Sequence, residues 1–183
     1  RDTDWSADER PDWWAGFVSQ LGLEIMRRIN GTAVVSPVAL TAVSLLASQQ
    51  RAMPADELAE RLSAYIGLLQ RAPYGPSLHI PETDGAVLLA RAEPIAGLQR
   101  VQHPWGDLVI AQDKEAVLLT YYRNSIQHLF ALPSLIANFF SARALRKRAE
   151  VISGSRALYP ILRDEWFLWD QEQNLTHAIE RQI

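Results

Sequence analysis

Cysteine is absent from the 183 residues. This excludes disulfides, thiol nucleophiles and cysteine-ligated metal sites, and it is compatible with a reducing compartment. A basic excess is also lacking, because 18 Lys and Arg residues stand against 21 Asp and Glu residues, for a net charge of −3. Proteins that bind nucleic acid are usually clearly basic. We therefore expect no nucleic-acid partner.

Long apolar runs are missing as well. A membrane-spanning helix needs about 20 apolar residues. The longest candidate, residues 129–140, is shorter than that and is interrupted by Pro133, Ser134 and Asn138. The chain begins with Arg1 and shows no charged-then-apolar leader, so no targeting peptide is expected. Residues 178–183 stop within a helical pattern, and we expect the chain to be part of a longer protein.

Motifs for catalysis or cofactor binding are scarce. The four histidines, residues 79, 103, 128 and 177, are too far apart for metal-ligand spacing. No Gly-rich phosphate loop and no Gly-x-Ser-x-Gly elbow occurs, and Ser153-Gly154-Ser155 is interpreted as a plain turn. We therefore expect no catalytic, metal or cofactor-binding residue in this chain.

His103 and Asp107 are the strongest candidates for chemistry. A histidine oriented by an aspartate can serve as a general base. The residues between them are Pro104, Trp105 and Gly106, and proline with glycine is typical of the turn of a β-hairpin. We therefore interpret this segment as the turn of a hairpin, with Asp107 at the start of a strand, and not as a catalytic pair.

Apolar periodicity predicts a mainly helical chain. Asn30-Gly31 is expected to end the first helix, and Ser36-Pro37 to begin the second. Helices are expected over residues 12–30, 36–50, 56–71 and 86–92, from 113 to a kink or end at Pro133, from 134 through the basic residues that follow, and over 156–169 and 171–183. Prolines and glycines between residues 72 and 85 indicate a surface loop. Two strands, residues 98–101 and 107–110, are expected to form a hairpin.

The fold class is thus mainly α, a multi-helix domain with a small β-hairpin. The order of helices and hairpin over residues 36–111 predicts a winged-helix-like arrangement. We expect two modules, residues 1–112 and 113–183, with Tyr121, Tyr122 and Leu158 buried. An interaction module of a regulator, without enzymatic activity, is the alternative function. DNA binding is disfavoured, because the expected recognition helix, residues 56–71, holds three acidic residues against two arginines.

A stretch without acidic residues runs from residue 116 to residue 149 and carries five basic side chains. It joins the apolar run 129–140 to a basic cluster. An apolar face followed by Arg and Lys suits a helix in the headgroup plane of an anionic membrane. The candidate contact residues are Phe139, Phe140, Arg143, Arg146, Lys147 and Arg148. A core helix with cations in its last turn and a dock for an acidic protein partner remain open.

Several runs of residues resemble the bacterial membrane-bound glycerol-3-phosphate acyltransferases, in the order of that family. They are LEIMRRIN (23–30), LLASQQR (45–51), AVLLTYYRNSI (116–126), LPSL (132–135), LYPIL (158–162) and DEWFL (164–168). The Tyr-Tyr-Arg-Asn run before Leu-Pro-Ser-Leu is the most specific of these. Together the runs cover about residues 14–169.

This resemblance implies a parent enzyme that acylates the first position of glycerol-3-phosphate, the entry step of phospholipid synthesis. The donor would be acyl-CoA or acyl-carrier protein. The family's catalytic His-x4-Asp motif lies upstream of the matched region, whereas His103 and Asp107 have three residues between them. The implied partners are the upstream acyltransferase domain, an anionic membrane surface and, as a candidate, acyl-carrier protein. The implied location is the cytoplasmic face of the bacterial inner membrane, as a peripheral or monotopic protein.

Overall fold

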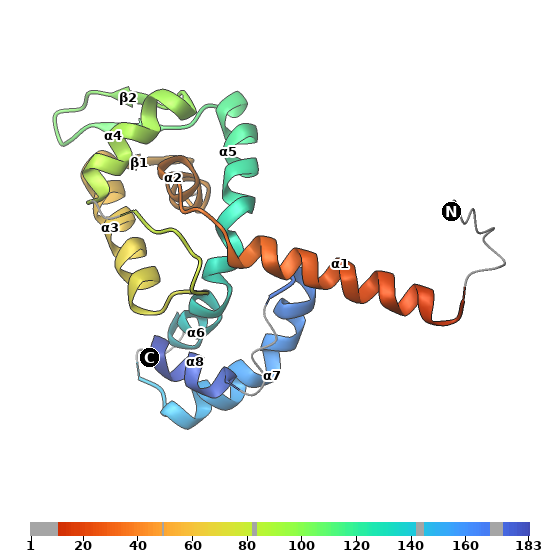
Figure 1. Cartoon of the computed structure of the whole chain (residues 1–183). Helices are drawn as coiled ribbons and strands as arrows, with labels where there is room; N and C mark the ends of the chain where they lie inside the picture. Colours follow the sequence, from red (N-terminus) through yellow and green to blue (C-terminus); the bar gives the residue numbers. More distant parts are fainter. Residues whose placement is uncertain (1–10, 49, 82–83, 142–144, 169–173) are drawn as a thin grey trace, which may run out of the picture.

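The chain is mainly helical, as predicted (Figure 1). The computed structural model describes residues 11–48, 50–81, 84–141, 145–168 and 174–183. The helices are α1 (Trp13–Gly31), α2 (Pro37–Leu46), α3 (Ala55–Arg71), α4 (Gly85–Ala96), α5 (Asp113–Ile126), α6 (Ala131–Ser141), α7 (Arg148–Trp166) and α8 (Leu175–Gln182), with a 3-10 helix at Gln127–Phe130. Three short strands, β1 (Ala52–Pro54), β2 (Gln99–Val101) and β3 (Leu108–Ile110), complete the fold.

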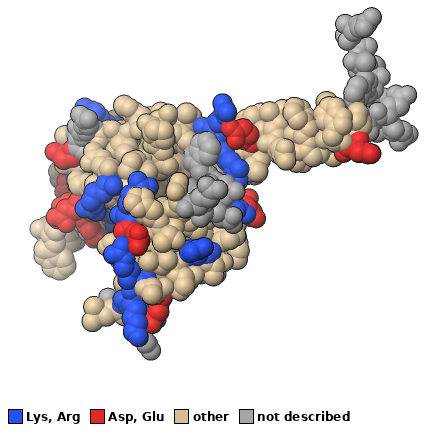
Figure 2. Space-filling view, turned by 60° about the horizontal axis from the view of Figure 1, so that its bottom comes forward, with Lys and Arg blue, Asp and Glu red and all other residues tan. Residues whose placement is uncertain are grey.

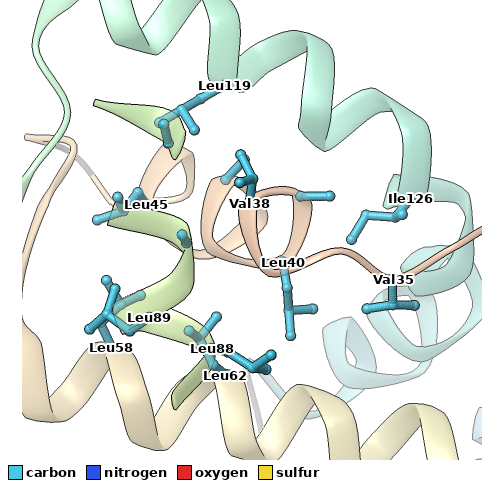
Figure 3. Packing of buried hydrophobic residues seen from close by; sticks show 14 of the residues in the cluster. Val35, Val38, Leu40, Leu45, Leu58, Leu62, Leu88, Leu89, Leu119 and Ile126 are labelled. Atoms are coloured by element: carbon cyan, nitrogen blue, oxygen red, sulfur yellow. The ribbon is translucent and has the colours of Figure 1, made fainter. Parts of the chain in front are cut away.

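The first hydrophobic core surrounds α2. This helix carries no charged side chain, and seven of its ten residues are buried. A helix that is apolar on all sides has to be enclosed by other elements, and α3, α4 and α5 enclose α2. Leu40 and Leu45 of α2, Leu88 of α4 and Leu119 of α5 are inaccessible to solvent (Figure 3).

Local signals fix the ends of several helices. The Ser36 hydroxyl accepts a hydrogen bond from the Ala39 N–H at 3.1 Å, so the predicted cap of α2 is confirmed. The Asp84 carboxylate caps α4 in the same way, through the Val87 N–H at 2.8 Å. Gly97 follows α4 with φ +65°, a left-handed conformation that glycine adopts readily. α4 thus ends at Ala96, directly before Gly97, which is four residues beyond the expected end at residue 92.

The predicted hairpin is confirmed, and it belongs to a three-stranded antiparallel sheet. β3 lies between β2 and β1, with Met53 of β1 opposite Val109 of β3. Sequence analysis missed β1. The order helix, strand, helix, helix, strand, strand over residues 37–110 agrees with the winged-helix-like arrangement. The second helix is shorter than expected, because α2 ends at Leu46 and not near residue 50.

A second hydrophobic core is built by α6, α7 and α8. It begins at Ala131 and includes Ile136, Val151, Tyr159 and Ile179. The first core, in contrast, extends through α5 and the 3-10 helix to Phe130. Packing therefore changes from one core to the other at residues 130–131, whereas the boundary expected at 112–113 falls within the first core.

Several expectations about the second half were wrong. Pro133 neither kinks nor ends the helix that begins at Asp113, because α5 ends earlier, at Ile126. Pro133 lies in the first turn of α6, where proline is tolerated because no backbone N–H is needed there. Ser153-Gly154-Ser155 is not a turn but part of α7, which begins at Arg148 and not near residue 156.

The expected burial of three residues also needs correction. Tyr121 is 81% exposed and Leu158 is 45% exposed, while Tyr122 is half-buried against the first core. Tyr121 follows the buried Leu119 by two positions, or about 200° around an α-helix, so it lies on the opposite face. The apolar character of Tyr121 did not indicate which face of α5 is turned inward.

Candidate functional site

The His103–Asp107 pair is not formed. His103 lies in the exposed turn between β2 and β3, where its Nδ1 accepts a hydrogen bond from the Trp105 N–H at 3.3 Å. Asp107 instead pairs with Arg100, with 3.4 Å between Oδ2 and the guanidinium. Glu93 binds the same guanidinium at 2.7 Å, and these carboxylates raise the pKa of Arg100. The arrangement considered from the sequence, a histidine base oriented by Asp107, is therefore absent, because Asp107 is engaged by Arg100.

Two cavities in the described ranges each contain a histidine but no acidic side chain that could orient it. An enclosed cavity of about 30 Å³ lies between the two cores, beside Tyr74, His128 and Tyr159. This is the space of about one water molecule. A larger depression of about 630 Å³ along residues 70–81 is open to solvent, and its lining includes His79 but no acidic side chain. Throughout the described ranges, no group of three His, Asp or Glu residues is placed to hold a metal ion.

His128 is the buried titratable group of this region. Its ring is 5% exposed, and Nε2 lies 3.0 Å from the Asn30 carbonyl oxygen. A carbonyl only accepts hydrogen bonds, so Nε2 carries the proton in the neutral ring. Burial lowers the pKa of His128 by disfavouring the charged imidazolium, against a smaller opposite effect of the Asn30 carbonyl. His128 thus joins the end of α1 to the centre of the molecule as a neutral donor.

This placement predicts a pH dependence of stability. The pKa is about 6.5 in the unfolded chain and lower in the folded one, so the unfolded state binds more protons between the two values. The contribution is complete above about pH 6.5 and is lost as the pH falls toward the folded pKa. We expect Tm to drop more between pH 7 and pH 5 in the wild type than in His128→Gln, followed by circular dichroism. Equal drops in both proteins would contradict this account.

The predicted membrane-contact residues separate into two groups. Phe139 and Phe140 are half-buried and pack against the second core. A Cβ added at Gly154 of α7 would lie 2.6 Å from the Phe139 ring, so the ring sits closely on this glycine. The Phe139 ring thus faces α7, and Phe140 is partly covered by the second core.

Basic side chains, in contrast, are exposed. Arg146, Lys147 and Arg148 lie on the surface where the chain enters α7. Arg146 Nε donates to the Phe139 carbonyl oxygen at 2.9 Å, and Arg148 lies 3.3 Å from Glu180 of α8. Arg143 falls outside the described residues. Figure 2 shows Lys and Arg side chains gathered along one side of this face, with a few acidic side chains among them.

Sequence analysis missed two apolar features of the surface. Leu145 directly precedes the exposed basic residues and is itself 90% exposed. The second feature is α1, which projects from the body with apolar side chains exposed along its length (Figure 1). The sequence does contain a signal for it, because residues 13–23 include no charged side chain. No described helix combines the length and the apolarity needed to cross a bilayer.

The family model and the similar proteins that match this chain all point to one family. The glycerol-3-phosphate acyltransferase C-terminal region matches residues 1–183. A glycerol-3-phosphate acyltransferase of Aeromonas hydrophila subsp. hydrophila is 38% identical over 173 residues, covering 94% of this chain and 21% of the relative. One of Pseudomonas aeruginosa (strain LESB58) is 35% identical over 174 residues, with the same coverages of 94% and 21%.

A third relative of that name, from Ectopseudomonas mendocina, is 36% identical over 165 residues, which are 90% of this chain and 20% of the relative. No solved structure matches. The chain spans about one fifth of the length of the curated relatives it matches. The comparisons do not favour the regulator alternative. The chain belongs to the family of glycerol-3-phosphate acyltransferase C-terminal regions.

Proposed function

We propose that this chain is the non-catalytic C-terminal part of an enzyme that acylates the first position of sn-glycerol 3-phosphate. The product would be lysophosphatidate, and the donor acyl-CoA or acyl-carrier protein. The match of residues 1–183 to the C-terminal region of this enzyme family carries the proposal. The engagement of Asp107 with Arg100 supports it, because His103 is then not oriented by this carboxylate.

The enzyme's activity should not depend on Asp107. In the full-length protein, Asp107→Asn is expected to leave the rate of lysophosphatidate formation within a few-fold of the wild type. Arg100 keeps Glu93 as a partner, so the hairpin should remain folded. His103→Ala is the matched variant. General-base catalysis contributes about 10²–10⁴-fold, and a loss of that size in a folded variant would place catalysis in this hairpin.

The 183-residue chain provides the complementary test. Incubated alone with glycerol-3-phosphate and a long-chain acyl-CoA, it should form no lysophosphatidate above a heat-killed control. Product formation would overturn the non-catalytic assignment. If the full-length protein also formed none, the proposed activity itself would be wrong.

The same proposal includes contact with an anionic membrane at the cytoplasmic face of the bacterial inner membrane. The contact would be made by Leu145, Arg146, Lys147 and Arg148, an exposed apolar side chain followed by exposed cations. Phosphatidylglycerol headgroups attract such cations, and each contributes about 1 kcal/mol near the surface. This revised surface replaces Phe139 and Phe140 by Leu145, because the two rings pack inward.

Vesicle binding tests this surface. Replacing Arg146 and Lys147 by Gln in the full-length protein should weaken binding to phosphatidylglycerol vesicles by about 2 kcal/mol, or roughly thirtyfold. Added salt should mimic the loss by screening, and phosphatidylcholine vesicles should show little difference. Arg156→Gln, an exposed change within α7, is the control. Unchanged vesicle binding with a raised KM for acyl-carrier protein alone would assign these cations to an acidic protein partner.

A further inference from the structure

α1 is an apolar helix whose large side chains stay exposed over most of its length among the described residues. Its exposed fractions are 58% at Trp13, 49% at Phe17, 47% at Leu21, 48% at Ile25 and 57% at Ile29. Figure 1 shows it leaving the body as a projecting arm. Helices in proteins owe most of their stability to packing of an apolar face, so the exposed face of α1 indicates a missing contact.

The shape of this face is defined by the spacing of its residues. At about 100° per residue, the large apolar side chains at positions 13, 14, 17, 18, 21, 25 and 29 form one broad stripe. Trp13 and Phe17 contact each other edge to face, with 5.9 Å between ring centroids. The opposite side carries Ala15, Gly16, Ser19 and Leu23, which are uncharged and include only one large side chain. Both sides can therefore approach another protein surface closely.

The charge of α1 does not suit an anionic membrane surface. Between residues 13 and 23 there is no Lys, Arg, Asp or Glu. An amphipathic helix on a bilayer usually carries Lys and Arg along its polar face. In α1 the basic residues are Arg27 and Arg28, and both lie near the C-terminal end, the root, where the helix joins the body. In Figure 2 the projecting helix is almost free of charged side chains between its root and its tip. A protein groove fits this helix better than headgroups do.

The root of α1 is held in a defined direction by contacts with the rest of the chain. Asn30 Nδ2 donates to the Trp166 carbonyl oxygen at 2.8 Å, and Arg27 Nε donates to the Leu168 carbonyl oxygen at 3.2 Å. His128 adds its hydrogen bond to the Asn30 carbonyl. These contacts fix the direction in which the outer turns of α1 project from the two cores. Less conformational entropy is then lost when α1 docks.

We propose that residues 13–25 of α1 dock into an apolar groove of the polypeptide that precedes residue 1. This inference rests on the proposed function, in which the chain is the C-terminal part of a longer acyltransferase. The matched relatives are about five times longer than the matched region. The twelve residues before Trp13 span at most about 40 Å, so the upstream polypeptide begins within that distance of the exposed stripe. Such a tether gives the contact a high effective concentration.

Spin labels in the full-length protein can identify what covers the stripe. The 183 residues contain no cysteine, so only upstream cysteines need replacement before Leu21→Cys is labelled. Val117→Cys, at a side chain that is 76% exposed, is the exposed reference. In phosphatidylglycerol nanodiscs, docking in a protein groove predicts low collision rates at position 21 with both oxygen and a nickel chelate. High rates with both reagents would overturn the proposal.

Other occupants give different signals. High oxygen and low nickel accessibility at position 21 would mean lipid, and dipolar coupling between labels would mean a second copy of the chain. Either result overturns the proposal.

Amide hydrogen exchange of the unlabelled full-length protein avoids any effect of substitution. It should show slow exchange over residues 13–25. Phe17→Ser with Leu21→Ser should abolish that protection while α2 and α5 stay protected, and Ser19→Ala with Gln20→Ala should not. Fast exchange of α1 in the wild type would contradict docking. These readouts are independent of acyltransferase activity, so a failure of the proposed function and a failure of docking remain distinguishable.

Discussion

Leu119→Ala is expected to lower the free energy of unfolding by about 3 to 5 kcal/mol, the range for a fully buried leucine. Leu119 is 0% exposed and belongs to the first core, where α5 packs along α2 (Figure 3). Removing the side chain loses the transfer free energy and leaves a cavity between helices that can only partly close. The measurement is urea unfolding of the 183-residue chain, followed by circular dichroism.

Leu118→Ala is the matched control, because Leu118 is the preceding residue of the same helix and is 47% exposed. Surface substitutions of this kind usually change stability by about 0.5 kcal/mol or less. The two variants have the same composition, so helix propensity cancels. Similar midpoints for both variants would show that α5 does not belong to the first core.

The place of α5 also shows where prediction from the sequence reaches its limit. The strand residues up to Ile110 and the acidic residues at the start of α5 correctly predicted the end of the hairpin and the beginning of a helix. They suggested a module boundary there, but Leu119 and Ile126 belong to the same core as α2, which is far away in the sequence. Local periodicity identifies an apolar face and does not identify its partner.

The candidate surface residues show the same limit. The absence of acidic residues from 116 to 149 directed attention to Arg146, Lys147 and Arg148, and these side chains are exposed. It could not reveal that Phe139 packs on Gly154, since this contact depends on how α6 crosses α7. Leu145 lies beyond the apolar run 129–140 and was not singled out, and its exposure is visible only in the structure.

For α1, the sequence predicted the helix and its apolar face, but the described chain does not contain the surface that would cover this face. Its bounds were predicted to within a residue, because aromatic and aliphatic side chains recur at helical spacing and Asn30-Gly31 ends the pattern. The same pattern predicts that the face is buried against something. In the described chain only the root of α1 is covered, so the covering surface has to come from elsewhere.

Gly85→Ala is expected to destabilise the chain by about 1 to 3 kcal/mol, the usual cost of overpacking. Gly85 begins α4 where that helix meets α3. A Cβ at this position would overlap the Ala59 carbonyl oxygen and approach Ser63 Oγ to 2.8 Å. The Gly85 N–H also donates to Ser63 Oγ at 2.8 Å. Because the obstacle is backbone, α4 has to shift away from α3, and Leu88 and Leu89 lose contacts in the core.

Gly67→Ala is the matched control, within α3 itself. An added Cβ there meets nothing within 4 Å, and alanine is favoured over glycine in a helix interior by about 1 kcal/mol. The same chemical change is thus expected to raise the free energy of unfolding at position 67 and to lower it at position 85. Urea midpoints of the two variants give the sign directly. A Gly85→Ala variant as stable as the wild type would mean that α3 and α4 are further apart than the Gly85 contacts require.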